Sequence, residues 1–348
     1  MNAKLKNLLR IVLFFSIGII ILYLVYHKQQ QSYLEECMAQ GIASEQCSLI
    51  DKLYEDFISA RIWPILTMIL LFVLSAVSRA LRWQMLLKPL QQNVSFLNSF
   101  LSVILGYFAN LGLPRLGEIV RAATLSRYEK IPLDKVMGTV LLDRIIDVIL
   151  MFLITCLAFI FAFKELSNFI AENNAMSDKI QNIIQNPYVV GGMLLFILAG
   201  VIIVLTPQIR QSKYGLRLKY FIKGLIEGIK SIKSIEKPGW FIFHSVFIWV
   251  MFFMMVFVGF HVIEPTSGLG LDAALVIFTL GSFGFIIPSP GGMGTYHFLV
   301  TSGLLIYGIS GSDGFSYANI TFFTVQIFGV VFLGILALIV LPLINKKR

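Results

Sequence analysis

The chain has 348 residues, of which 57% are hydrophobic and only 14% are charged, and its mean hydropathy is +0.82. These values exclude an ordinary soluble globular protein and indicate a polytopic membrane protein. A net charge of +9 would suit a nucleic-acid-binding protein, but the basic residues lie in loops, where a positive-inside bias puts them. We therefore expect membrane lipids as partners and no nucleic acid. Apolar runs approaching ~20 residues predict an all-α fold and argue against a β-barrel.

The first apolar segment covers residues 8–26 and follows a basic start, as in a signal anchor whose N-terminus lies in the cytoplasm. No small-residue cleavage site follows it, so we expect the helix to be retained. The loop at residues 27–61 is acidic and is predicted to lie outside. It contains Cys37 and Cys47, and an outside compartment would permit a disulfide between them. Two free thiols are the alternative.

Five further full crossings are predicted. They cover residues 62–81, 136–163, 189–205, 240–263 and 317–344. Arg79, Arg82 and Lys88 are taken to mark the cytoplasmic end of the first of these. The segment at 207–239 is rich in lysine, with apolar residues at helical spacing, and is expected to lie on an anionic membrane surface. The basic last three residues place the C-terminus, like the N-terminus, in the cytoplasm.

Two other apolar runs are expected not to cross. Residues 96–113 have basic sequence on both sides, and residues 273–287 break at PSPGGMG (288–294) before a return loop without lysine or arginine. Both patterns indicate re-entrant hairpins, which enter from opposite faces and whose non-helical tips must be covered by protein or water. Opposed hairpins are typical of inverted repeats that build a site at the membrane midplane. A simpler topology of eight crossings is the alternative.

We therefore expect one integral membrane domain over residues 1–348. An anchor helix and external loop at 1–61 precede a first half at 62–206, and the basic segment at 207–239 leads to a second half at 240–348. Each half would contain one re-entrant hairpin.

Charged residues lie inside or beside these apolar segments. The candidates are Arg115, Glu118, Arg121, Asp143, Arg144 and Asp147. The first three recur at a spacing of three, so a helix beginning near Pro114 would bring them close to one face. A helix N-terminus with arginines could bind a phosphate. An interfacial helix whose charges simply face water is the alternative.

Asp143 and Asp147 are one helical turn apart and are expected to lie ~10–16 Å inside the next helix. Carboxylates at that depth are costly and need partners. They either line a polar cavity or belong to a neutral salt-bridge cluster without a ligand. Anion binding would need further positive charge, which could come from Arg79, Arg82 and Arg127.

The PSPGGMG sequence contains too many prolines and glycines for a regular helix. Its candidate residues are Pro290, Gly291, Gly292 and Gly294, followed by His297. The turn is either a tight re-entrant tip or a tip whose N–H groups face substrate, and it lacks the G-K-[S/T] ending of a phosphate-binding loop. His297 either titrates near neutral pH or is hydrogen-bonded packing. No motif for a metal, a cofactor or a catalytic triad occurs, so we expect neither cofactor nor enzyme activity.

Three motifs follow one another in the chain: NLGLPRLGEIVRA (110–122), DRIID (143–147) and SPGGMGTY (289–296). With them the chain resembles the flippase-like integral membrane family typified by the transmembrane region of lysylphosphatidylglycerol synthases, over most of residues 60–345. The resemblance implies a multi-pass protein of a prokaryotic cytoplasmic membrane that moves an aminoacylated phospholipid or lipid-linked precursor between leaflets. It points to Arg115, Glu118, Arg121, Asp143, Arg144 and the Pro-Gly turn.

Two departures from the family pattern bear on the substrate. Relatives commonly carry Glu shortly after the turn, where this chain has His297. The chain also lacks the soluble aminoacyltransferase domain of full synthases, so it should not make lysyl-lipid by itself. The sequence thus predicts a translocator for an anionic or zwitterionic lipid whose headgroup passes between the two hairpins. A membrane-embedded transferase and a non-transporting scaffold are the alternatives, and a homo-oligomer is compatible with each.

Overall fold

The computed structural model describes residues 3–88, 94–112, 116–172, 235–287 and 289–346. Every regular element in these ranges is a helix, which confirms the predicted all-α fold. The chain divides into two compact units, one formed by Met1–Phe161 with Ile235–Arg348 and one formed by Ala162–Ser234. Only the last residues of one helix are described in the second unit. The fold that positions the site belongs to the first.

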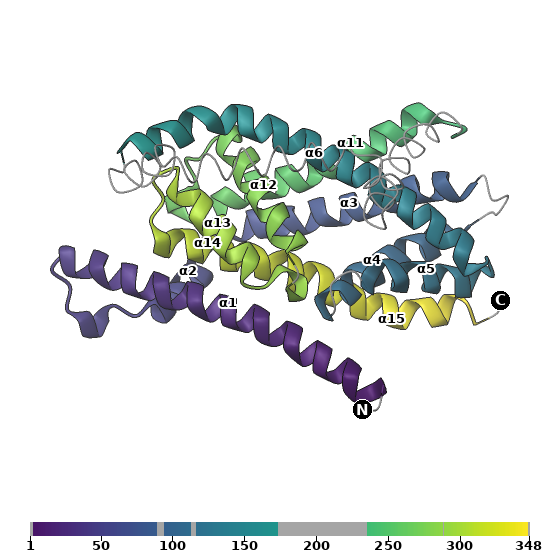
Figure 1. Cartoon of the computed structure of the whole chain (residues 1–348), viewed down its shortest axis with the longest axis horizontal. Coiled ribbons are helices and arrows are strands. Elements are labelled where there is room, and N and C mark those ends of the chain that lie inside the picture. The colour runs from purple at the N-terminus through teal and green to yellow at the C-terminus, as the bar shows by residue number, and fades with distance from the viewer. Residues whose placement is uncertain (1–2, 89–93, 113–115, 173–234, 288, 347–348) are drawn as a thin grey trace, which may run out of the picture. The chain divides into compact units, whose positions relative to one another are not determined.

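The described residues before position 173 form the first group of helices in Figure 1. These are α1 (Ala3–Ala39), α2 (Leu49–Ser59), α3 (Ile62–Leu87), α4 (Phe96–Gly112), α5 (Leu116–Glu129) and α6 (Leu133–Glu172), with a 3₁₀ turn, η1 (Ser44–Gln46), ahead of α2. The second group follows residue 234. It consists of α11 (Pro238–Gly259), the turns η3 (Phe260–Val262) and η4 (Glu264–Thr266), α12 (Leu271–Ile286), the turn η5 (Pro290–Gly292), α13 (Thr295–Leu305), α14 (Gly311–Phe323), the π-helical η6 (Thr324–Val331) and α15 (Phe332–Ile344).

Several helices are long and apolar enough to cross a membrane, which confirms a polytopic membrane protein. Within the described part of the chain they are Ile62–Leu87, Leu133–Phe161, Pro238–Val262 and Gly311–Ile344. The predicted anchor at residues 8–26 falls inside α1. The predicted crossing at 189–205, and residues 207–234 of the basic segment, lie outside the described residues.

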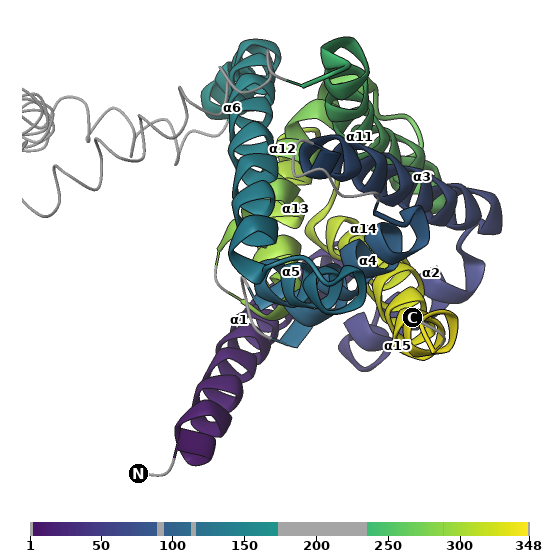
Figure 2. The same ribbon diagram turned by 90° about the vertical axis from the view of Figure 1, so that its right-hand side faces the viewer.

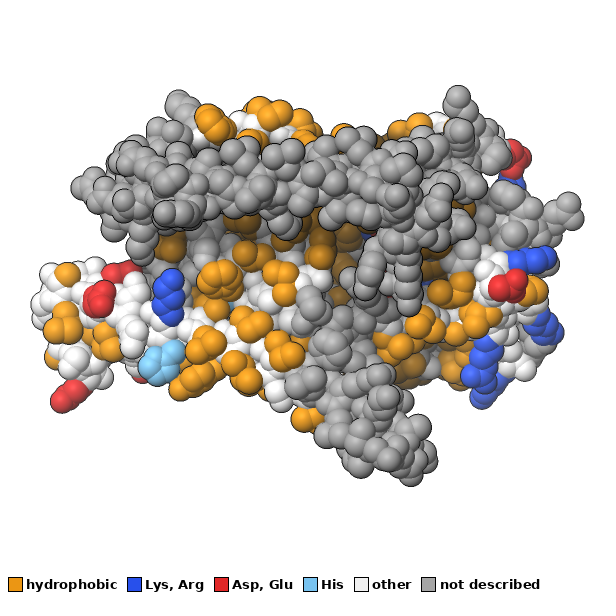
Figure 3. Space-filling view, in the orientation of Figure 1, with side chains coloured by type: hydrophobic (Ala, Val, Ile, Leu, Met, Phe, Trp, Pro, Cys, Tyr) orange, Lys and Arg blue, Asp and Glu red, His pale blue; other side chains and the backbone are white. Residues whose placement is uncertain are grey.

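The long helices carry large hydrophobic side chains on their outer surface and charged ones inside. Phe152 and Ile160 on α6 and Phe332 on α15 are 67%, 68% and 65% exposed, whereas Arg82 and Asp143 are completely buried. On the face drawn in Figure 3, charged side chains lie toward the left and right ends, and hydrophobic ones lie between them. This distribution is the reverse of a soluble protein and fits a surface covered by lipid.

Two pairs of short helices lie between the long ones. Helix α4 packs against α5, and α12 packs against α13 (Figures 1 and 2). These helices have 17, 14, 16 and 11 residues, fewer than the ~20 needed for a full crossing. Helix pairs of this length are what re-entrant hairpins require. That the pairs re-enter and do not cross remains a prediction.

The α4–α5 pair is held together by backbone contact at two glycines. A Cβ atom on Gly117 would overlap the carbonyl oxygen of Gly106 and lie 2.6 Å from the Asn110 side chain. Asn110 Oδ1 accepts a hydrogen bond of 2.7 Å from the Gly117 N–H, which satisfies a free donor near the start of α5. The NLGLPRLGE motif thus brings α5 close against α4 and fixes the direction in which Arg121 points.

Helix α2 is tied to the body of the protein by its charged residues. Lys52 forms ion pairs of 3.0 Å with Asp56 and 2.8 Å with Asp313, at the start of α14, and Ser316 donates a hydrogen bond of 2.5 Å to Asp56. The opposite side of α2 is apolar and exposed. Its residues are Ile50, Tyr54, Phe57 and Ile58, which recur at helical spacing.

Cys37 and Cys47 are both buried near this helix, at the end of α1 and just after η1. Both are free thiols in the structure, so of the two alternatives for this loop the structure has the reduced one. Cys47 Sγ donates to the carbonyl oxygen of Ala43 at 3.4 Å.

Candidate functional site

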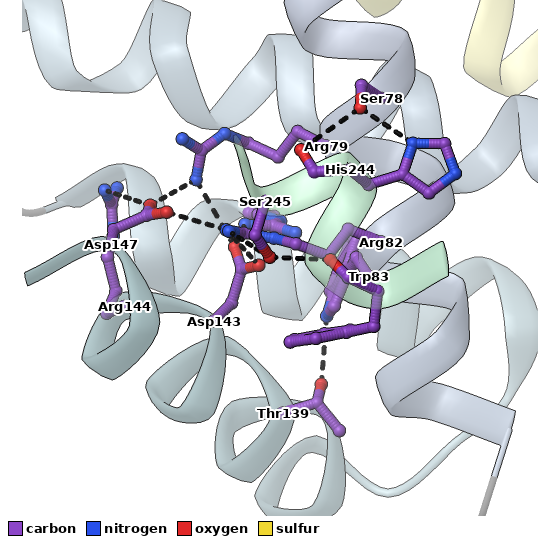
Figure 4. Close-up of polar contacts among 12 residues, drawn as sticks. Ser78, Arg79, Arg82, Trp83, Thr139, Asp143, Arg144, Asp147, His244 and Ser245 are labelled. Carbon is purple, nitrogen blue, oxygen red and sulfur yellow. Dashed lines mark hydrogen bonds and ion pairs between the residues drawn. The ribbon is translucent and has the colours of Figure 1, made fainter. Parts of the chain in front are cut away.

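The centre of the site is a buried cluster of three arginines and two aspartates, of which Figure 4 labels Arg79, Arg82, Asp143 and Asp147. The third arginine is Arg121. Arg82 Nη2 lies 2.6 Å from Asp143 and 2.8 Å from Asp147. Arg79 Nη1 lies 2.5 Å from Asp147 and 3.4 Å from Asp143. Arg121 Nη1 donates to Asp143 at 2.8 Å. Asp143 therefore forms ion pairs with three guanidinium groups, and we call these five residues the charge cluster.

Helical spacing explains how these side chains meet. Arg79 and Arg82 lie three residues apart on α3, and Asp143 and Asp147 lie four apart on α6, so each pair shares one face of its helix. Arg121 comes from α5, whose position against α4 is set by the two glycines. Three helices thus contribute to the cluster, and the ion pairs join segments that are far apart in the sequence.

The charge cluster lies well inside the span. At ~1.5 Å per residue, Arg79 is roughly 12 Å from the end of α3, and Asp143 and Asp147 are roughly 15 and 21 Å from the start of α6. The expected end of this crossing at residue 81 was too early, because α3 continues to Leu87. Arg79 and Arg82 are consequently 4% and 0% exposed and do not mark a helix end.

Neutral polar and aromatic groups surround the cluster. The Arg121 guanidinium lies 3.9 Å from the centre of the Trp83 ring, a cation–π contact. Trp83 in turn donates to Thr139 Oγ1 at 2.9 Å, which holds the indole between α3 and α6. On α11, Ser245 accepts a hydrogen bond of 3.4 Å from Arg82 Nη1. Sequence reasoning did not single out Trp83, Thr139 or Ser245, because each resembles ordinary core or helix-lining sequence.

A second ion pair lies at the outer edge of the cluster. Arg144 Nη2 is 2.7 Å from Glu118 Oε1, and their side chains are 39% and 23% exposed. Arg144 is also 3.9 Å from Asp147, so the outer pair touches the charge cluster. We call Glu118 and Arg144 the outer pair. An exposed pair of this kind contributes only ~0–1 kcal/mol, much less than a buried one.

A small pocket lies between the charge cluster and the outer pair. It is lined by Arg79, Val103, Gly106, Tyr107, Gly117, Glu118, Arg121 and Arg144 and has room for about one water molecule. Several buried polar atoms at this pocket have no hydrogen-bond partner within the described part of the chain. They are Arg121 Nε and Nη2, Arg79 Nε, Arg144 Nε, Tyr107 Oη and Glu118 Oε2. In this conformation the pocket is too small for a lipid headgroup.

The predicted charged residues are therefore brought together, with one exception. Glu118, Arg121, Asp143, Arg144 and Asp147 meet as described, while Arg115 lies outside the described residues. Arg79 and Arg82, which the sequence offered only as suppliers of extra charge, are central members. The third such residue, Arg127, has its guanidinium 5.9 Å from the ring of the adjacent Tyr128.

The Pro-Gly turn occupies a different place. Gly291, Gly292 and Gly294 have positive φ values of 55°, 82° and 80°, a conformation that favours glycine. A Cβ on Gly294 would lie 2.8 Å from the Gly18 carbonyl oxygen, so the turn packs against α1. The side-chain amide of Gln326, in the π-helical segment, donates to the Gly291 carbonyl at 3.3 Å. Leu111, near the end of α4, lies against Gly291 as well, so the turn is tightly packed between α1, α4 and the last crossing.

The other two candidates at the turn, Pro290 and His297, are also buried. Pro290 is buried, and its ring lies 3.0 Å from where a Cβ on Gly18 would be. His297 is 1% exposed, accepts a weak hydrogen bond of 3.3 Å from the Gly294 N–H, and packs 4.7 Å from the Phe322 ring. Of the two expectations for His297, this geometry favours hydrogen-bonded packing. The described residues also contain no group of three His, Cys, Asp or Glu side chains that could hold a metal ion.

Apolar, lipid-facing helices around a buried network of guanidiniums and carboxylates define a polytopic membrane protein with an intramembrane charged site. A model of the lysylphosphatidylglycerol synthase transmembrane region matches residues 49–334, and the chain belongs to this family. A UPF0104 membrane protein of Methanocaldococcus jannaschii is 32% identical over 101 residues, or 28% of this chain. That match spans only 30% of the relative's own length. No solved structure matches the chain.

Proposed function

We propose that this chain moves a phospholipid or lipid-linked precursor with an anionic or zwitterionic headgroup between the leaflets of a prokaryotic cytoplasmic membrane. Both termini would lie in the cytoplasm, and membrane lipids would be its partners. The observation that carries the proposal is the charge cluster itself, which has three guanidiniums and two carboxylates among the described residues and lies amid lipid-facing helices. Charges at such depth are rare and mark pathways for polar groups.

The site would engage the headgroup through its arginines. Arg121, Arg144 and Arg79 line the pocket, and a guanidinium binds a phosphate through paired hydrogen bonds. Asp143 and Asp147 would hold the arginine side chains in place, since both carboxylates accept from more than one of them. The acyl chains would stay in the bilayer along the apolar outer surface.

Passage of a headgroup requires a wider opening than the structure has. The outer pair joins α5 to α6 and is partly exposed, so its separation costs far less than breaking the buried pairs. We therefore propose that the first turn of α5 moves away from α6 at Glu118 and Arg144, while the Arg121–Asp143 pair, one turn further along α5, and the rest of the charge cluster stay intact. The Pro-Gly turn, packed on α1, would then act as a fixed support and not as a substrate contact.

Leaflet exchange of a fluorescent phospholipid in proteoliposomes tests the proposal. We expect Arg121→Gln to slow the exchange strongly and Arg121→Lys to retain part of it, because lysine keeps the charge without the planar fork. Arg61→Gln is the matched control, since Arg61 pairs with Glu264 at a partly exposed position away from the charge cluster. Equal exchange by Arg121→Gln and wild type, with both proteins folded, would refute the proposal.

A second experiment tests the opening at the outer pair. Cysteines replacing Glu118 and Arg144 in a Cys156→Ala background would allow a short bifunctional reagent to link α5 to α6. Cys156 is the exposed one of the three cysteines. Because this variant lacks the Arg144 guanidinium, its unlinked form is the reference. We expect the link to remove the exchange that this form retains, and cleavage of the link to restore it.

A non-transporting structural role is a second candidate, because the ionic groups of the charge cluster are paired with one another in the buried interior. Paired charges of this kind can specify one packing of the helices without binding anything. This role predicts that cross-linking the outer pair changes nothing in the exchange assay. It also predicts that wild-type protein gives no exchange above protein-free liposomes.

A further inference from the structure

The described charges around the pocket do not balance. The positive members are Arg79, Arg82, Arg121 and Arg144, and the negative members are Glu118, Asp143 and Asp147. One guanidinium is therefore in excess, with or without the outer pair. Arginine does not deprotonate in proteins, so the excess cannot be relieved by losing a proton. A buried charge without a counter-charge is strongly unfavourable.

The excess positive charge is least compensated at Arg121. Arg79 and Arg82 each contact both aspartates, whereas Arg121 reaches only Asp143, through Nη1. Its Nε and Nη2 atoms have no hydrogen-bond partner among the residues that the structure describes, although the side chain is only 4% exposed. The Trp83 ring lies against the guanidinium but supplies no anionic atom. Two of the three nitrogen atoms of the Arg121 guanidinium therefore lack an acceptor among the described residues.

The pocket offers the place for one. Arg121 lines it, together with Arg79 and the Tyr107 hydroxyl, which is a further donor without a partner in the described ranges. The pocket has space for about one water molecule. A halide ion is similar in size to water, whereas a phosphate or carboxylate group is larger. Glu118 also lines the pocket: its Oε1 pairs with Arg144 at 2.7 Å, and its Oε2 has no partner among the described residues, so its charge opposes an anion there.

We propose that this pocket binds one small monovalent anion, with chloride as the physiological type. The Arg121 Nε–H and Nη2–H groups and the Tyr107 hydroxyl would donate to it. The ion would balance the excess guanidinium while the helices are closed. One further step rests on the proposed function: a phosphate oxygen of a lipid headgroup takes the place of this ion when α5 and α6 part.

Thermal unfolding of the whole chain in a non-ionic detergent tests the anion site. Sodium chloride is exchanged for sodium gluconate at constant ionic strength, since gluconate is too large for the pocket. We expect the Tm of wild type to rise with chloride along a saturable curve, by roughly 5–10 °C at ~100 times the dissociation constant. Arg61→Gln, a surface control, should behave like wild type.

Two substitutions at the pocket should change the chloride dependence of the Tm in different ways. Arg121→Gln removes the excess charge and the donors, so its Tm should not depend on chloride. Glu118→Gln removes a negative charge beside the pocket, so the chloride concentration at half of the Tm rise should fall several-fold. If Arg121→Gln does not fold, the shift in Glu118→Gln still decides. A wild-type Tm equal in chloride and gluconate, or a chloride dependence unchanged in these variants, would overturn the proposal.

Adding an anionic phospholipid to the detergent separates this proposal from the proposed function. Competition, seen as a higher chloride concentration for half-saturation, supports a site shared by ion and headgroup. Saturable chloride binding that the lipid does not affect leaves the anion site in place and counts against the lipid step. If the protein exchanges lipid between leaflets but its Tm does not depend on chloride, the proposed function stands and the anion site is refuted.

Discussion

Replacement of Asp143 by Asn tests the physical basis of the charge cluster. Asp143 is completely buried and lies 2.6 Å from Arg82, 2.8 Å from Arg121 and 3.4 Å from Arg79. Asn keeps the shape but loses the charge, so the excess of one guanidinium becomes two. Removing one partner of a buried ion pair costs about 3–5 kcal/mol. With about 2–4 °C per kcal/mol for a large domain, we expect the Tm to fall by roughly 6–20 °C.

The assay is thermal unfolding in detergent, followed by loss of the monodisperse peak in size-exclusion chromatography. Asp134→Asn is the control, because Asp134 lies exposed in the first turn of the same helix and should contribute within about 1 kcal/mol. Combining Asp143→Asn with Arg121→Gln restores the wild-type excess. The double variant should therefore lose less stability than the two single variants added together. Equal Tm values for Asp143→Asn and Asp134→Asn, or full additivity, would refute this account.

Three further predictions concern the elements around the site. Gly117→Ala should lower the free energy of unfolding by about 1–3 kcal/mol, because a Cβ at this position overlaps the α4 backbone. Gly138→Ala is the control: nothing lies near its Cβ, so it should be neutral or stabilising. Thermal unfolding measures both. A fluorophore attached to Tyr54→Cys should be quenched by lipid-borne quenchers, and one attached to Glu55→Cys by aqueous iodide. The reason is that only position 54 lies on the exposed apolar side of α2. The opposite pattern would show that no membrane covers this side of the helix. The ratio of leaflet exchange between His297→Gln and wild type should stay constant from about pH 5.5 to 8, because a histidine packed on Phe322 is not a proton carrier; a ratio that changes with pH would restore the titrating role.

The sequence alone determined that this is a membrane protein and that its fold is helical. Apolar runs such as that in α3 must be helical in a bilayer, because only a helix satisfies its own backbone there. The same logic singled out Asp143 and Asp147, since carboxylates in an apolar helix need partners. The motif at residues 110–122 also contained both Arg121 and the Gly117 that positions it.

The tertiary structure decided which partners those carboxylates have. Arg79 and Arg82 meet Asp147 across more than 60 residues of sequence, and no local spacing indicates such a contact. It also placed the Pro-Gly turn against α1, Leu111 of α4 and Gln326, where it takes no part in the ion pairs of the charge cluster. Helical periodicity shows which side chains share a face, but the face that each helix turns toward another depends on packing of all of them together. The excess guanidinium, and the small pocket beside it, follow from that packing.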